Sequence, residues 1–294
     1  MLPLDANRKG LNMITDNRRN FIKGMCSTAA LAAAGCTVPC KTGAKPRYAL
    51  QLYSIHKIFW KNPERILVDL KAGGYDGVEF YDNNGLTAKA LRKMCDDAGL
   101  KAMGTHLNGD VALVGDELKK TLDYAAEAGF ESVVTPHAKR DSADGYRAFG
   151  RAMGLAAEAA DVYGIKVGIH STYHHFTTVY GSETAWDMIY KEASPKLYQQ
   201  IDTANTFHTG YDVVGLLKKY PNRHFSLHAK ENVPTVDGVL GVPPTDCGKC
   251  VPWPELIAYM KTECSLKWWI IEAEGKPASL DPALKCLAQL KSWT

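Results

Sequence analysis

Short apolar runs alternate along this chain with longer stretches in which apolar residues recur every three or four positions. The short runs predict strands at 48–54, 77–81, 102–107, 132–137, 166–171, 198–202, 224–228 and 268–272. The longer stretches predict helices at 63–72, 87–98, 115–128, 142–163, 183–193, 211–219, 253–263 and 281–292. Strands separated by helices of this length run parallel and are buried on both faces. The pattern therefore predicts an α/β fold with strictly alternating elements.

A four-fold motif supports these boundaries. In each copy a helical stretch closes on Gly, continues with an apolar residue and a charge, and enters an apolar run that ends on Glu or His. The glycines are Gly74, Gly99, Gly129 and Gly164, and the runs end at Glu79, His106, His137 and His170. Gly adopts the left-handed conformation that other residues resist, so each copy predicts a helix end followed directly by a strand.

The helix starts carry weaker signals. Pro63, Pro254 and Pro282 stand in predicted first turns, where the missing N–H is harmless. Asn62 and Asp281 precede two of these prolines and are expected N-caps.

Eight strand–helix pairs fit a closed barrel better than an open sheet. An open doubly wound sheet usually has a phosphate loop, and no G-x-G-x-x-G follows the first predicted strand. About 250 residues is the usual size of an eight-stranded barrel. We therefore predict a (β/α)8 TIM barrel over 47–294, with its site where the strands end.

The first 46 residues do not fit this fold. Arg18-Arg19 and an apolar, Ala-rich run ending at Cys36 resemble a twin-arginine export signal, followed by a linker. The expectation is an exported, periplasmic protein, with a lipid anchor at Cys36 as a further option. A disordered basic tail is the alternative.

The charge, the hydropathy and the cysteines exclude some classes of protein and some kinds of site. The formal charge is +3 and the basic residues are scattered, so nothing calls for a nucleic acid partner. No apolar run reaches the roughly 18 residues of a membrane span. Cys247 and Cys250 form a C-x-x-C that fits a local disulfide or two free thiols better than a zinc site. The sequence leaves the oligomeric state open, a homo-oligomer included.

Four strand ends carry the chemistry. His170, Asp202, His228 and Glu272 would supply two imidazoles and two carboxylates from neighbouring strands. Taken singly, a His at a strand end is more often structural, and an Asp after a strand is commonly a helix cap. Together, on a closed barrel, they suit one divalent metal ion such as Mn²⁺, Mg²⁺, Co²⁺ or Zn²⁺, with positions open to substrate oxygens.

The order of strand-end residues resembles the xylose-isomerase-like barrel family of sugar isomerases and epimerases, which also contains a DNA-repair endonuclease. The resemblance rests on Gly77-Val78-Glu79, Thr105-His106, Asp202-Thr203, His228-Ala229-Lys230-Glu231 and Ile271-Glu272, and it covers about 47–294. It implies that Asp202, His228 and Glu272 are metal ligands. His170 takes the place of a metal-binding Glu, so a symmetrical two-glutamate mechanism is in doubt.

Residue types then suggest a mechanism. A divalent ion would polarise a sugar carbonyl and the neighbouring hydroxyl, and a carboxylate would remove the proton between them to give an enediolate. Glu272 and Glu274 share a face of an extended strand, so either is the expected base. Lys230, on the same face as His228, would neutralise a developing oxyanion, although a solvated surface lysine is the alternative.

Other polar residues at the barrel mouth are expected to bind the sugar. Gln51, Tyr53, Glu79, His106 and His137 would hydrogen-bond its hydroxyls, and His174, beside His175 in an aromatic loop, would stack on it. For each of them a structural role is about as plausible.

The expected partner is a small-molecule sugar or glycoside. A metal-dependent isomerase or epimerase is the first hypothesis. A lyase that eliminates the aglycone of a 3-keto-glycoside is the second, because the same proton abstraction starts it. A non-catalytic sugar-binding barrel is the third. DNA cleavage ranks low, because the chain has no excess basic charge to hold a duplex.

Overall fold

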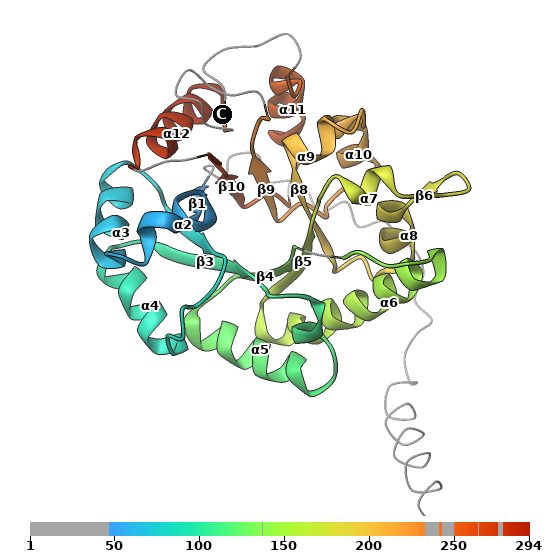
Figure 1. The fold of residues 1–294 in the computed structure, drawn as a ribbon, viewed down its shortest axis with the longest axis horizontal. Helices are drawn as coiled ribbons and strands as arrows, with labels where there is room; N and C mark the ends of the chain where they lie inside the picture. Colours follow the sequence, from blue (N-terminus) through green and yellow to red (C-terminus); the bar gives the residue numbers. More distant parts are fainter. Residues whose placement is uncertain (1–46, 137, 233–240, 243–249, 264, 276–278) are drawn as a thin grey trace, which may run out of the picture. The chain divides into compact units, whose positions relative to one another are not determined.

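A computed structural model describes residues 47–136, 138–232, 241–242, 250–263, 265–275 and 279–294. Eight parallel strands close into a barrel that is ringed by helices (Figure 1). The strand order is β1-β10-β9-β8-β5-β4-β3-β2, and every neighbouring pair is parallel. The barrel strands are β1 (Arg47–Gln51), β2 (Gly77–Phe80), β3 (Lys101–His106), β4 (Ser132–Thr135), β5 (Lys166–His170), β8 (Tyr198–Asp202), β9 (Ser226–Ala229) and β10 (Trp268–Ile271). The predicted (β/α)8 TIM barrel is confirmed.

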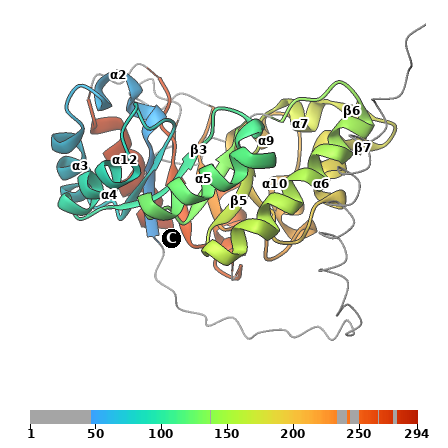
Figure 2. The ribbon, with the colours of Figure 1, turned by 90° about the horizontal axis from the view of Figure 1, so that it is seen from below.

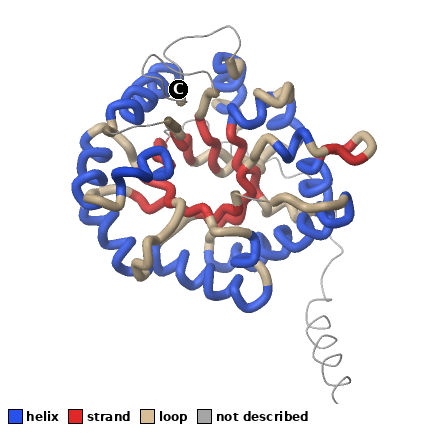
Figure 3. The backbone as a smooth tube through the Cα atoms, in the orientation of Figure 1, coloured by secondary structure: helices blue, strands red, loops and turns tan. Residues whose placement is uncertain are grey.

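A long helix follows each barrel strand and covers the outside of the barrel (Figure 3). These helices are α3 (Pro63–Ala72), α4 (Ala88–Asp97), α5 (Gly115–Ala128), α6 (Ala143–Ala160), α8 (Ala185–Glu192), α10 (Val213–Lys219), α11 (Trp253–Met260) and α12 (Asp281–Trp293). Helix α4, for example, buries an apolar stripe that contains Leu91, Met94 and Cys95. Fully burying one such apolar side chain contributes about 1.5–3 kcal/mol.

The sequence pattern missed several short elements. They are η1 (Leu52–Ile55), α2 (His56–Phe59), η2 (Asp110–Leu113), η3 (Asp161–Tyr163), α7 (His174–Thr177), the antiparallel pair β6 (Val179–Tyr180) and β7 (Glu183–Thr184), and α9 (Thr203–Phe207). One helical turn is too short to show a period. Tyr53 consequently lies in η1 rather than in the predicted strand 48–54.

The four motif glycines all have positive φ: Gly74 98°, Gly99 70°, Gly129 74° and Gly164 68°. Gly129 is the left-handed C-cap of α5, and its N–H bonds back to carbonyls of the last turn. Asn62 stands at the N-cap of α3 as predicted, whereas the N-cap predicted at Asp281 is wrong. The Asn62 side chain makes no capping bond, and Asp281 is already the first residue of α12, which Leu280 precedes at the cap.

The N-terminal end of the barrel interior is apolar. Ala49, Met103, Trp268 and Ile270 form a buried cluster there, separate from the larger core between strands and helices. A Cβ at Gly77 would lie 2.9 Å from the Trp268 ring, so the missing side chain makes room for the indole.

Polar groups close this end around the indole. Trp268 Nε1 donates to Glu131 Oε2 at 2.9 Å, and the Arg47 guanidinium lies 3.6 Å over the indole while it pairs with Glu131 at 3.2 Å. The indole N–H, the carboxylate and the guanidinium are therefore all partnered.

The short elements gather at the other end of the barrel. In the side view, α2, α7 and β6 lie toward the upper edge, whereas the C-terminus after α12 lies toward the lower edge (Figure 2). These elements follow strands, so the upper edge is the end at which the strands finish and where a TIM barrel carries its site.

Several sequence-based expectations concern residues outside the described ranges. They are the export signal and linker in 1–46, the lipid anchor at Cys36, the substrate contact of His137, and Cys247. Cys250 is disulfide-bonded. None of the described helices is long and apolar enough to cross a membrane.

Candidate functional site

The barrel brings the four predicted metal ligands together. His170 and Asp202 end β5 and β8, His228 lies in β9, and Glu272 follows β10 directly. Because these four strands are neighbours, one ligand atom from each residue lies within 4.8 Å of the others, and all four residues are buried.

Two atoms of this cluster have no hydrogen-bond partner. His170 Nε2 and Asp202 Oδ2 are buried and lie 3.6 Å apart, too far for a hydrogen bond. Burial lowers the pKa of His170 to about 4, so the ring is neutral and its lone pair is free to bind a cation. A buried, unpartnered carboxylate oxygen is costly unless it has a ligand. This donor set therefore fits a divalent metal ion.

Asp202 caps a helix and also faces the cluster. Its Oδ1 accepts a bond from the Asn205 N–H at 2.8 Å and caps α9. Its Oδ2 is the unpartnered atom that faces His170. The helix cap thus fixes the carboxylate and leaves one oxygen for the site.

His228 lies between two carboxylates. Its Nδ1 is 2.6 Å from Glu272 Oε2, and its Nε2 is 2.8 Å from Glu79 Oε2. Burial lowers the pKa of the His228 ring, but Glu79 and Glu272 outweigh burial and raise it to about 10. A metal ion bound at Nδ1 would have to replace the proton that faces Glu272. Glu79 would still accept the Nε2 N–H, as a carboxylate usually does for a metal-binding histidine.

Glu79 is fully buried behind His228. Gln51 Nε2 and Gln200 Nε2 donate to its two oxygens at 2.6 and 2.7 Å, and His106 Nε2 lies 3.3 Å from Oε2. Burial alone would raise the pKa of Glu79, but His106 and His228 hold it well below its usual range. The buried position suits an anion that orients His228 better than a contact to substrate.

Gln200 is a site residue that the sequence reasoning missed. Besides Glu79, its amide nitrogen donates to Ser226 Oγ at 3.0 Å, and its Oε1 lies 2.8 Å from His106 Nε2. A signal was available, because Gln199 and Gln200 are two polar residues inside a predicted buried strand.

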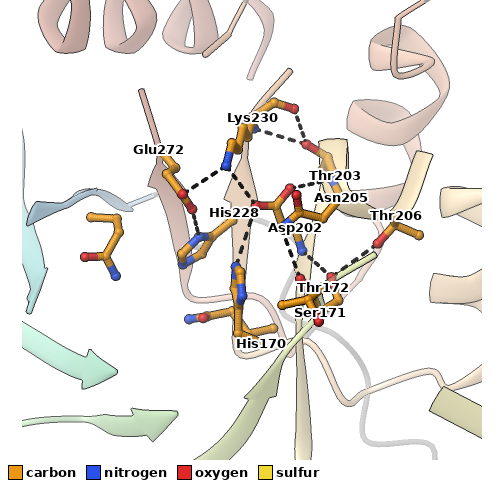
Figure 4. A network of polar contacts seen from close by, with 12 residues as sticks. His170, Ser171, Thr172, Asp202, Thr203, Asn205, Thr206, His228, Lys230 and Glu272 are labelled. Carbon is orange, nitrogen blue, oxygen red and sulfur yellow. Dashed lines mark hydrogen bonds and ion pairs between the residues drawn. The ribbon is translucent and has the colours of Figure 1, made fainter. Parts of the chain in front are cut away.

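Lys230 is buried among carboxylates, not solvated (Figure 4). Its Nζ lies 3.0 Å from Glu272 Oε1, 3.0 Å from Glu274 Oε2 and 3.8 Å from Asp202 Oδ2. These carboxylates raise its pKa although burial opposes them, so the ammonium keeps its charge. Thr203 Oγ1 accepts the Lys230 N–H and donates to its carbonyl, which fixes the backbone here.

Glu274 is the more exposed of the two candidate bases, with a side chain 34% exposed against 7% for Glu272. Burial and the neighbouring Glu272 charge raise the pKa of Glu274 to about 7. Glu272 stays ionised, because Lys230 and His228 lower its pKa against the effect of burial.

A cavity of about 400 Å³ opens beside these groups. This volume is within the usual range of small-molecule sites, about 300–1,000 Å³. Its walls come from the ends of β1, β2, β3, β4, β5 and β10. The lining residues are Gln51, Tyr53, Tyr81, His106, Leu107, Asn108, Pro136, His170, Thr172, Glu272 and Glu274.

The residues expected to bind substrate are distributed unevenly around this cavity. Gln51, Tyr53 and His106 line it. His174 lies in α7 outside the lining, 2.9 Å from Thr172 Oγ1 and with its ring against His175. Thr172 itself reaches the cavity wall.

The chain belongs to the xylose isomerase-like TIM barrel family, whose model matches residues 67–290. No curated protein matches the sequence.

Solved structures share the fold at low sequence identity. A sugar phosphate isomerase/epimerase from Parabacteroides distasonis ATCC 8503 is 20% identical with a TM-score of 0.69, over 89% of this chain and 98% of that one. A 3-keto-D-glucoside 4-epimerase from E. coli is 14% identical with a TM-score of 0.62, over 84% and 100%. An L-ribulose 3-epimerase is 15% identical with a TM-score of 0.57, over 82% and 86%. At this identity the similarity establishes the fold.

Proposed function

We propose that this protein is a divalent-metal-dependent sugar isomerase or epimerase that removes a proton next to a carbonyl. The observation that supports this proposal is the buried cluster of His170, Asp202, His228 and Glu272, in which two facing atoms have no hydrogen-bond partner. A divalent ion held there would polarise the carbonyl and hydroxyl oxygens of a sugar. The family, and the sugar isomerase and epimerases among the similar structures, support sugars as the substrate class.

The chain's own groups supply the proton chemistry. Glu274 reaches the cavity and can exchange protons with solvent, so it is our proposed base, with Glu272 as a ligand. The Lys230 ammonium lies between both carboxylates and would stabilise negative charge that develops on the substrate.

A 3-keto-glycoside lyase is the second candidate. It begins with the same proton abstraction and differs in expelling the aglycone. The similarity to the E. coli 3-keto-D-glucoside 4-epimerase favours this substrate class. A sugar-binding barrel without chemistry is the third candidate.

One set of assays separates the three candidates. Purified protein is loaded with Mn²⁺, dialysed, analysed for bound metal, and incubated in D₂O with free ketoses or with a 3-keto-glucoside. Deuterium at the carbon next to the carbonyl supports the isomerase or epimerase, and release of the aglycone supports the lyase. Sugar binding without metal and without deuterium exchange contradicts both enzymes. Glu274→Gln should lower the exchange rate at least about 100-fold while metal stays bound.

A further inference from the structure

An aromatic wall stands at the edge of the cavity, on the side opposite β5. Tyr53 lines the cavity and keeps 48% of its surface exposed. Tyr81, which follows β2, also lines it and stands edge-on to Tyr53, with ring centroids 5.6 Å apart at 84°. An aromatic ring exposed beside a polar site, and held in place, is suited to stack on the C–H face of a sugar.

Local contacts hold Tyr53 in place. The His56 ring stacks on Tyr53 at 4.6 Å with an interplanar angle of 16°, and His56 Nδ1 bonds the Tyr53 carbonyl at 2.7 Å. The Tyr53 N–H donates to Gln51 Oε1 at 3.1 Å, and the same Gln51 side chain donates to Glu79. A ring fixed in this way loses little conformational entropy on binding.

The cavity joins this wall to the proposed reaction centre. Its lining includes His170, Glu272 and Glu274 as well as Tyr53 and Tyr81. The polar groups and the aromatic groups line the same cavity but come from the ends of different strands. This separation suits a ligand with two parts, one that reacts and one that only stacks.

We propose that Tyr53 and Tyr81 form a second subsite, which binds a further pyranose ring, so that the substrate is a disaccharide or a similar glycoside, not a free monosaccharide. The inference deepens the proposed function and rests on it for the identity of the reacting ring. A glucose-configured ring is the best occupant, because its equatorial hydroxyls leave axial C–H bonds on a flat face.

The test is a titration of the full chain with cellobiose and with D-fructose, a free ketose that has no glucose-configured ring, by isothermal calorimetry or saturation-transfer NMR. Wild type should bind cellobiose more tightly. Tyr53→Ala should reduce that preference by about two- to tenfold and leave the affinity for the monosaccharide unchanged. Tyr53→Phe should keep the preference. Tyr163→Ala is the matched control, because Tyr163 is an exposed tyrosine outside the cavity that bonds Asp123.

Three results would overturn the subsite: no preference for cellobiose in wild type, an unchanged preference in Tyr53→Ala, or an equal loss for both sugars. The last result would place Tyr53 against the reacting ring. The binding titration needs no turnover. If metal analysis and deuterium exchange both fail while the Tyr53-dependent preference persists, the proposed function alone is wrong.

Discussion

The two ends of the barrel interior differ in whether their polar groups are all hydrogen-bonded. At the N-terminal end, Trp268 fills the interior and its N–H, the Glu131 carboxylate and the Arg47 guanidinium satisfy one another. At the C-terminal end, carboxylates and imidazoles are buried, and His170 Nε2 and Asp202 Oδ2 have no hydrogen-bond partner. The polar groups of the first end satisfy one another within the chain, whereas the second end leaves a donor set that suits a divalent metal ion. The variants below test this division.

The largest effect is expected from Trp268→Ala. Removing a buried Trp leaves a cavity and should lower the free energy of unfolding by about 3–5 kcal/mol, measured by urea titration. The folded variant should still bind one metal ion, since Trp268 belongs to the opposite end. Loss of metal binding in protein that remains folded would show that the two ends are not independent.

Metal addition should stabilise only proteins with an intact C-terminal end. At a metal concentration 1,000 times Kd, wild type should gain about 4 kcal/mol in the free energy of unfolding. His228→Ala should bind no metal and gain nothing, and His228→Gln serves if the first variant does not fold. The matched control is His224→Ala, because His224 is a buried histidine just before β9. The free energy of unfolding of this variant should still rise when metal is added. If metal raised the free energy of unfolding of both His228 variants as it does for wild type, the assigned site would be contradicted.

A smaller effect should follow from Glu79→Gln. The amide still fills the space but no longer accepts the His228 N–H as a charged group, so metal affinity should fall about 10–100-fold, measured by competition with a chelator. Glu263→Gln is the control, because Glu263 is buried beside His224 outside the cluster. Equal affinities in wild type and Glu79→Gln would remove Glu79 from the metal site.

The smallest effect is expected from Arg47→Ala. Its pair with Glu131 is part-exposed, with side chains 40% and 31% exposed, so the loss in unfolding free energy should be about 1 kcal/mol or less. Metal affinity should not change. A loss of several kcal/mol would mean that the cation over Trp268 stabilises this end more than its exposure suggests.

Most of the fold could be predicted from the sequence because local signals and the barrel agree. Gly129 and Gly164 adopt the left-handed conformation expected of them, and the strands that follow begin within a few residues of the predicted positions. The exceptions are single turns such as α2 and α9, which have no period to detect. Asp281 begins its helix instead of capping it, since boundaries depend on the packing of the whole turn.

The site could be predicted only in part. Ligand types at the ends of strands are visible in the sequence, and barrel closure brings them together. Which polar residues face substrate and which face one another is not visible, because it depends on contacts across the barrel. Glu79 was expected at the substrate and is buried behind His228, whereas Gln200 was overlooked although it joins Glu79 to His106.

Glu79 also limits how this pocket can be altered. One carboxylate is shared among Gln51 of β1, His106 of β3, Gln200 of β8 and His228 of β9. A replacement at any of these positions would leave the buried Glu79 carboxylate without one of its partners. Paired substitutions should therefore be strongly non-additive. Engineering a different specificity would require exchanging these side chains as a group.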